Sequence, residues 1–284
     1  MIDNEILGKV CSKIFDEQEP VLKTGFKDLD FILSGIEKNA LITVGARPAM
    51  GKTSFITTIL LNLLEQNKKC LFFSMEMSTE QLIKRLLCQI SEVDAHLLNM
   101  PEEISKRKQS VEKITMAIET LSKYDLTITD GTFNIEKIRE EIEQNKPEYV
   151  FIDYLQLINV PEKKPRSESF EKIMLDLKHI AKDNNCMIFI SSQLSRALEC
   201  RCDKRPLLSD LRESGAIENI SDVVLFIYRD EYYNLENDEY SIINKGKAEI
   251  IAAKNRYGSV GIINLLFRPS IMKFLEPLNN DYTF

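Results

Sequence analysis

Short apolar runs alternate with longer amphipathic segments along most of this chain. Eight runs rich in β-branched and aromatic residues predict strands, at 41–44, 70–74, 126–129, 149–154, 187–191, 223–228, 248–254 and 260–267. Several of these runs are apolar at nearly every position, which is typical of strands covered on both faces in a parallel sheet. Apolar residues at helical spacing predict helices at 53–66, after a capping box at 78–81, and at 135–145 and 170–183. This alternation predicts a single α/β domain.

Two segments depart from the alternation. Only 255–259 (NRYGS) separates the last two predicted strands, and so tight a connection predicts an antiparallel hairpin at one edge of the sheet. Residues 1–20 carry apolar side chains at helical spacing, at Ile6, Leu7, Val10, Ile14 and Phe15. A helix outside the main pattern must bury this face, either on its own domain or on a neighbouring subunit, and the pattern favours neither.

Composition indicates a folded protein in a reducing compartment. The chain has 284 residues, of which 44% are hydrophobic and 29% are charged. No apolar run approaches the roughly 18–20 residues that cross a bilayer, and the first residues lack the apolar core of a signal peptide. Six cysteines are too sparse for a disulfide framework, so we expect thiols, a cytoplasmic protein and no membrane partner. We interpret Cys200 and Cys202 as loop thiols rather than zinc ligands, because both histidines are far away in sequence.

The net charge is −7 at pH 7. This value argues against a surface that grips nucleic acid by bulk positive charge, but a local basic strip, such as one lining a channel in an oligomer, remains compatible with it.

The stretch 44–55, VGARPAMGKTSF, resembles the phosphate-loop pattern G-x-x-x-x-G-K-[ST], except that Ala46 replaces the first glycine and Gly45 comes one place early. It follows an apolar strand and precedes an amphipathic helix, so backbone N–H groups and the helix N-terminus would converge on a phosphate. An alanine is acceptable if the backbone keeps an ordinary φ there. We therefore predict a nucleotide site formed by Ala46, Arg47, Pro48, Ala49, Met50, Gly51, Lys52, Thr53 and Ser54, with Lys52 on the β/γ-phosphates and Thr53 on Mg²⁺.

Three polar residues stand at the ends of other apolar strands. Asp153, in YVFIDYLQLI, is the candidate carboxylate beside the metal, since an unpaired buried charge would be costly. Glu76 ends the strand after the phosphate-loop helix, where a base could activate water. Gln193 ends a further strand and could sense the γ-phosphate. Taken alone, neither Glu76 nor Gln193 decides between such a role and an ordinary polar position.

The segment 195–233, SRALECRCDKRPLLSDLRESGAIENISDVVLFIYRDEYY, resembles the signature region of bacterial replicative hexameric helicases of the DnaB type. Further similar motifs follow in the same order: GARPAMGKTSF, SMEMSTEQL, FIDYLQLI, ISSQLSRALE and AEIIAAKNRYGSVGIINLLF. The similarity extends from about residue 24 to 274, and the family's phosphate loop also carries the alanine. The chain thus resembles the isolated C-terminal motor: residues 1–20 match the linker helix, which would dock on a neighbouring subunit, and 21–284 match the RecA-like ATPase domain.

The resemblance implies a homo-hexameric ring that hydrolyses ATP with Mg²⁺, encircles single-stranded DNA, moves 5′ to 3′ and unwinds duplex. In this family Lys52 and Thr53 would hold phosphate and metal, Asp153 would support the metal, Glu76 would activate water, and Gln193 would couple nucleotide state to DNA contact. Primase and a helicase loader are the partners that the resemblance implies.

The resemblance also places each active site between subunits. Lys254 and Arg256 match the lysine and arginine that these helicases send into the neighbour's site, although composition alone favours a solvated turn. Arg212, Glu213 and Gly215 match the family's DNA-contacting loop. A second candidate DNA loop, which could equally be a solvated turn, contains Lys163, Lys164 and Arg166.

Two other classes of protein share parts of this pattern. A RecA-like recombinase or clock-type ATPase has the same phosphate loop, but SDLRESGAIE followed by the late K-x-R hairpin favours a helicase. A non-catalytic docking platform would not need its catalytic residues, and Lys52, Glu76, Asp153 and Arg256 are all intact.

Overall fold

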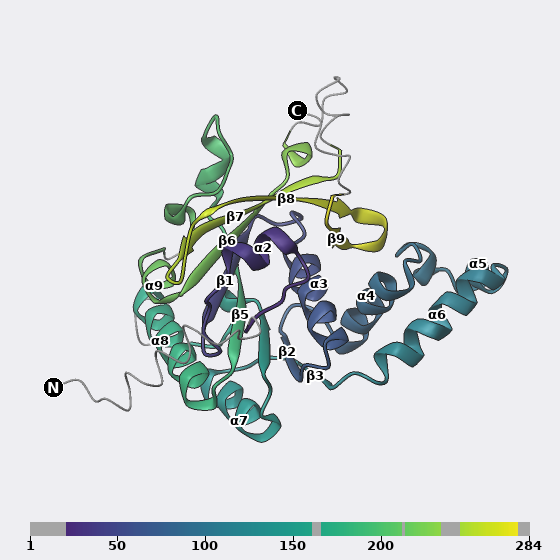
Figure 1. Ribbon diagram of the computed structural model, residues 1–284, viewed down its shortest axis with the longest axis horizontal. Helices are drawn as coiled ribbons and strands as arrows, with labels where there is room; N and C mark the ends of the chain where they lie inside the picture. The colour runs from purple at the N-terminus through teal and green to yellow at the C-terminus, as the bar shows by residue number, and fades with distance from the viewer. Residues whose placement is uncertain (1–20, 161–165, 212–213, 234–244, 278–284) are drawn as a thin grey trace, which may run out of the picture.

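The computed structural model describes residues 21–160, 166–211, 214–233 and 245–277. Within these residues a nine-stranded sheet forms the centre of the molecule, in the order β3-β2-β4-β5-β1-β6-β7-β8-β9 (Figure 1). The strands are β1 (Leu41–Ala46), β2 (Cys70–Ser74), β3 (Leu126–Asp130), β4 (Tyr149–Asp153), β5 (Met187–Gln193), β6 (Val223–Tyr228), β7 (Lys247–Asn255), β8 (Gly261–Arg268) and β9 (Lys273–Leu275).

Most of the sheet is parallel. The pairs from β3 across to β6 are all parallel, whereas β7 pairs antiparallel with β6, β8 with β7, and β9 with β8. The predicted α/β sheet and the hairpin at one edge are therefore confirmed. All eight predicted strands are present with ends within two residues, and the sequence missed β9, a three-residue strand outside the hairpin.

The helices include the four that the sequence predicted. The α-helices are α2 (Lys27–Ile32), α3 (Lys52–Glu65), α4 (Thr79–Ser91), α5 (Pro101–Ser105), α6 (Lys108–Leu121), α7 (Ile135–Asn145), α8 (Arg166–Asn184) and α9 (Ser214–Ile220). Short 3₁₀ helices are η1 (Leu97–Asn99), η2 (Leu155–Leu157), η3 (Arg196–Cys200), η4 (Leu208–Asp210), η5 (Asp230–Tyr232) and η6 (Pro269–Ile271). The predicted capping box before α4 is formed by Ser78 and Gln81.

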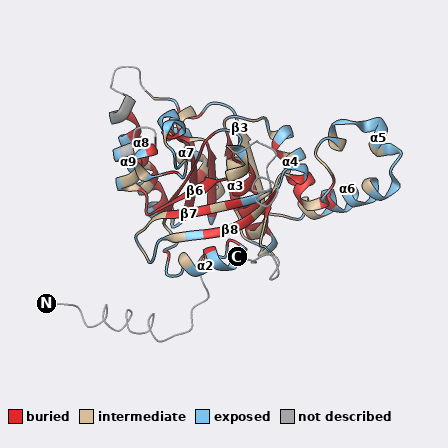
Figure 2. Ribbon diagram, turned by 90° about the horizontal axis from the view of Figure 1, so that it is seen from above, coloured by how far each residue is buried: buried red, intermediate tan, exposed pale blue. Residues whose placement is uncertain are grey.

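The unpredicted helices α5 and α6 project from the body of the molecule beyond α4 (Figures 1 and 2). Ala117 is the buried residue that α6 contributes, and large apolar side chains of the same helix are exposed. A helix that packs this little carries a weak core pattern, which is why the sequence did not reveal it.

Apolar side chains cover both faces of the sheet, because successive residues of a strand point to opposite sides. On one face Phe72, Phe151 and Phe189 from three adjacent strands stack with ring centroids 6.0 and 5.0 Å apart, in one core with α2 and α3. On the other face a second core unites alternate strand residues with α7, α8 and α9 (Figure 2). This double burial explains why several of the parallel strands, such as β2 and β4, are apolar at nearly every position, as predicted.

Among the described residues, every helix is either too short or too polar to cross a lipid bilayer.

Candidate functional site

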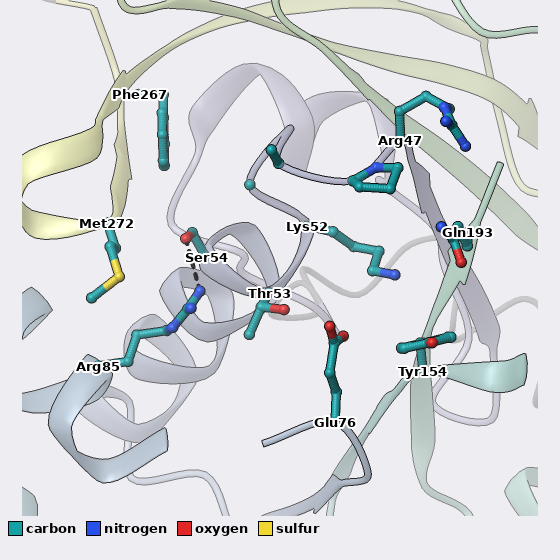
Figure 3. A pocket seen from close by; sticks show the side chains of 13 residues that line it. Arg47, Lys52, Thr53, Ser54, Glu76, Arg85, Tyr154, Gln193, Phe267 and Met272 are labelled. Carbon is teal, nitrogen blue, oxygen red and sulfur yellow. Dashed lines mark hydrogen bonds between the residues drawn. The ribbon is translucent and has the colours of Figure 1, made fainter. Parts of the chain in front are cut away.

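A cavity of about 360 Å³ lies beyond the carboxyl ends of the parallel strands, where open α/β sheets bind their ligands (Figure 3). The predicted loop after β1 supplies Arg47, Pro48, Ala49, Gly51, Lys52, Thr53 and Ser54 to its lining, and other elements supply Glu76, Arg85, Tyr154, Gln193, Phe267 and Met272. The structure thus brings together the loop, Glu76 and Gln193. Two members of the predicted loop, Ala46 and Met50, are buried in the core and are absent from the lining.

The backbone of the loop explains its unusual sequence. Gly51 has φ +95°, and a Cβ there would also lie 3.1 Å from Phe274, so glycine is required just before Lys52. Ala46 is the last residue of β1, in register with Gln193, and is not among the residues with positive φ. An alanine at the first position of the loop therefore costs no backbone strain.

Gly45, the glycine that comes one place early, serves packing rather than phosphate binding. A Cβ at this position would lie 2.8 Å from the Phe226 ring and 3.0 Å from Leu194 Cδ2. Both neighbours are buried, so neither can move aside easily.

We expect Gly45→Ala to destabilise the fold by about 1–3 kcal/mol, since the added methyl overpacks the core between β1 and β6. Urea unfolding measures this directly. Gly215→Ala is the control, because a Cβ at Gly215 meets no atom within 4 Å, and its unfolding midpoint should not fall. Equal midpoints for Gly45→Ala and the parent protein would contradict the packing role.

Thr53 and Asp153 meet as predicted. Thr53 Oγ1 donates a 2.6 Å hydrogen bond to Asp153 Oδ2, and Ser191 Oγ donates to the other carboxylate oxygen. Asp153 is 2% exposed, so these bonds compensate a buried charge. Hydroxyl and carboxylate oxygens are the ligands that Mg²⁺ prefers, and the pair therefore fits a magnesium ion bound with substrate phosphates. The sequence did not single out Ser191, which lies inside β5.

Lys52 extends into the cavity from the first turn of α3 (Figure 3). Its Nζ lies 4.4 Å from the centroid of the Tyr154 ring. Burial lowers the pKa of Lys52, while the carboxylates of Asp153 and Glu76 act in the opposite direction. A poorly solvated ammonium of this kind gains strongly from an anionic ligand. The Glu76 side chain points toward the loop from the opposite wall (Figure 3).

Arg85 is a cavity residue that the sequence analysis missed. From α4 its Nη1 donates a 3.2 Å hydrogen bond to Ser54 Oγ, while its buried Nε has no hydrogen-bond partner among the described residues. Burial lowers the pKa of Arg85, although Asp153, Cys88 and Glu76 raise it. A buried N–H group without a partner in a cationic cavity points to an anion as ligand. No local signal separates Arg85 from its neighbour Lys84, which pairs with Glu80 in solvent.

Lys254 and Arg256 lie at the other end of the sheet. β6 runs parallel to β1, and its first residue, Val223, pairs with Asn255, so the end of β7 lies beside the amino ends of the parallel strands. The loop with Lys52 follows the carboxyl end of β1, which is 6 residues long. At ~3.3 Å per residue the two ends are about 20 Å apart. Within one chain, neither Lys254 nor Arg256 lines the cavity.

Of the predicted DNA-contacting residues, the structure describes the positions of Arg166 and Gly215. Lys163, Lys164, Arg212 and Glu213 lie outside the described residues, as does the whole of 1–20. Arg166 is the first residue of α8 and Gly215 lies in the first turn of α9. Their roles stay predictions.

Comparison with known proteins agrees with this architecture. The family model "DnaB-like helicase C terminal domain" matches residues 21–276. The chain belongs to this family. It is 39% identical over 266 residues to the replicative DNA helicase DnaC of Bacillus subtilis (strain 168), and 38% identical over 267 residues to the replicative DNA helicase DnaB of Geobacillus stearothermophilus. Each alignment covers 90% of this chain and 56% of the relative, so the chain spans about half the length of these relatives.

Solved structures superpose closely on this domain. One of them, described as an ATPase domain, matches with a TM-score of 0.89 and 31% identity, covering 98% of this chain and 100% of that one. A DnaB-like replicative helicase, described with its interactions with primase, matches with a TM-score of 0.87 and 32% identity, covering 97% of this chain and 67% of that one. The predicted RecA-like ATPase fold and the predicted family are therefore confirmed.

Proposed function

We propose that this chain is the motor of a replicative DNA helicase, which hydrolyses ATP at the interfaces of a homo-hexameric ring in the cytoplasm. One observation carries the proposal: the cavity holds the phosphate loop and Glu76, whereas Lys254 and Arg256 lie at the opposite end of the same sheet. Two identical subunits side by side can combine one chain's cavity with the other chain's cations, as rings built from a repeated heterologous interface do.

The cavity suits phosphoryl transfer, which depends mainly on positioning and on neutralising charge. Lys52 and Arg85 would bind the phosphates of ATP, with the loop N–H groups at the start of α3. Glu76 would take the proton of the attacking water, and Gln193 would contact the γ-phosphate. Thr53 and Asp153 would hold Mg²⁺, which would supply positive charge against the phosphates.

Single-stranded DNA is the proposed track, with movement from 5′ to 3′ and exclusion of the second strand. The candidate contacts are Arg212, Glu213 and Gly215 before and in α9, and Lys163, Lys164 and Arg166 before and in α8. A few basic groups and backbone N–H groups, repeated around a ring, grip a strand without sequence preference despite a net charge of −7. Primase and a helicase loader are proposed as protein partners, in line with the primase described for a similar structure.

The first test is the rate of ATP hydrolysis with and without single-stranded DNA, at protein concentrations that span ring assembly. We expect turnover per subunit to rise with protein concentration and again with DNA. A rate that depends on neither would mean that the site is complete within one subunit, and the proposal would fail.

Substitution of Arg85 by glutamine is expected to weaken ATP binding by about 10- to 100-fold, since charge-assisted hydrogen bonds contribute about 1.5–3 kcal/mol. Titration with a fluorescent ATP analogue measures the loss. Lys84→Gln is the matched control, because Lys84 precedes Arg85 on α4 and its partner Glu80 is exposed. Equal affinities for the two variants would contradict a phosphate contact for Arg85.

Residues 1–20 are proposed to dock on a neighbouring subunit through their apolar positions. The exposed apolar face of α6 offers a receiving surface: Val111 and Ile118, two turns apart, are 39% and 51% exposed. We expect Ile6→Asp with Val10→Asp to shift the ring toward smaller species in analytical ultracentrifugation, and Val111→Asp with Ile118→Asp to do the same. Ser12→Asp, at a polar position of the same segment, should leave the ring intact. Rings unaffected by both double variants would disprove this docking.

A further inference from the structure

Asp222 is a buried carboxylate next to Lys254 and Arg256, the two cations that lie far from the cavity of their own chain. Its side chain is 3% exposed. Among the described residues its oxygens accept hydrogen bonds from Lys178 Nζ at 2.6 Å, from the Leu41 backbone N–H at 2.8 Å and from Arg256 Nη1 at 3.1 Å. The Arg256 backbone N–H also donates to the Asp222 carbonyl at 2.9 Å. Asp222 is thus fixed by β1 and α8, and Arg256 is fixed to Asp222.

The end of α9 provides a second anchor for the same cations. Arg256 Nη2 donates to the carbonyl of Asn219, and Lys254 Nζ donates to the carbonyls of Glu218 and Asn219. Carbonyls in the last turn of a helix lack intrahelical partners and carry partial negative charge, so they accept these bonds readily.

The positive charges of Lys254 and Arg256 would repel each other if no negative charge lay nearby. Burial lowers the pKa of Lys254 and the nearby Arg256 lowers it further, whereas Asp222 and Glu218 raise it. Asp222 is the buried member of this group, and it faces Lys178 and Arg256 on its two carboxylate oxygens. It therefore offsets charge repulsion where the end of β7 meets α9.

We propose that Asp222 is a positioning residue for Arg256. Among the described residues, Asp222 and the Asn219 carbonyl accept hydrogen bonds from two of the five N–H donors of the guanidinium, which leaves the other three for the nucleotide phosphates of the next subunit. The Arg256 side chain is 46% exposed, so its outer edge is accessible to a partner. Fixing a long side chain before it meets the transition state removes an entropy cost from the reaction. This inference rests on the proposed function, in which Arg256 acts on the neighbouring site.

Rings assembled from two different variants test separately the subunit that supplies the cavity and the subunit that supplies the arginine. Arg256→Ala subunits keep an intact cavity but lack the arginine, and Glu76→Gln subunits keep the arginine but lack the base. Each alone should be inactive, and a mixture should regain ATP turnover wherever a Glu76→Gln subunit inserts Arg256 into an Arg256→Ala cavity. A mixture without turnover would overturn the intersubunit arginine, and the role of Asp222 with it.

The test of Asp222 then adds Asp222→Asn to only one of the two kinds of subunit in the mixed ring. On the Glu76→Gln subunit, which supplies the arginine, the change should lower the regained turnover by at least about tenfold. On the Arg256→Ala subunit, which supplies the cavity, it should lower it by less than about twofold. Equal losses on both sides would show a general structural effect, and no loss on the arginine side would show that Asp222 is dispensable. Either result overturns the proposal.

Two further variants guard against misfolding. Lys178→Met on the arginine side removes the other cation of Asp222 but keeps its bond to Arg256, so turnover should stay within about twofold. Asp222→Asn combined with Lys178→Met avoids a buried unpaired lysine and should still show the loss. If Lys178→Met reduced turnover as much as Asp222→Asn, the effect would belong to local stability, and the positioning role would be rejected.

Discussion

Replacing Arg256 with alanine is expected to lower ATP turnover by about 10³-fold or more, while nucleotide binding stays within about twofold of the parent protein. The arginine lies at the amino end of the sheet, about 20 Å from the cavity of its own chain, so it cannot hold the nucleotide there. We propose that it stabilises charge that develops on the phosphates in the next subunit. Steady-state hydrolysis and equilibrium binding of a labelled ATP analogue measure the two quantities separately.

The Arg256→Ala protein should remain folded. Asp222 keeps its bonds to Lys178 and to the Leu41 N–H when Arg256 is absent, so the carboxylate is not left unpaired in the core. Lys247→Ala is the control, because Lys247 is an exposed cation at the far end of the same strand. Loss of nucleotide binding in Arg256→Ala would indicate a role within its own subunit, and full turnover would exclude the arginine from catalysis.

The centre of the sheet was predictable from sequence because burial on both faces marks several of its strands with apolar runs. Phe72, Phe151 and Phe189 face one core while Leu71, Val150 and Ile188 face the other, so the first four residues of β2, β4 and β5 are all apolar. The projecting helices α5 and α6 bury few side chains, so their sequences carry no comparable apolar pattern. β9 is three residues long, too short for a period to show.

The candidate site was predictable to the extent that it is local in sequence. Lys52 and Thr53 belong to one loop, and Asp153 ends an apolar strand, so parallel topology alone brings them together. Arg85 and Ser191 enter through side-chain packing between distant segments, which no short motif records. The proposed pairing of the cavity with Lys254 and Arg256 of a second subunit comes only from family resemblance, because the two parts are at opposite ends of one subunit.

Glu76→Gln is the second substitution with a large expected effect. The amide has the shape of the carboxylate but cannot accept a proton, so we expect turnover to fall by about 10²- to 10⁴-fold while ATP binding is retained. Single-turnover hydrolysis, with the protein in excess over ATP and concentrated enough to bind all of it, isolates the chemical step. Glu80→Gln is the matched control, since Glu80 lies four residues further on, is 78% exposed and pairs with Lys84 on the surface of α4.

The two measurements, ATP turnover and ATP binding of Glu76→Gln, together distinguish a base from a residue that merely shapes the cavity. Glu76 points toward the loop and adds negative charge near Lys52, so removing that charge should leave ATP affinity equal or slightly tighter (Figure 3). A residue needed only for cavity shape would lose binding and turnover together. Weaker ATP binding with an unchanged chemical rate would therefore reject Glu76 as the base and leave Gln193, on the neighbouring wall, as the residue that orients the water.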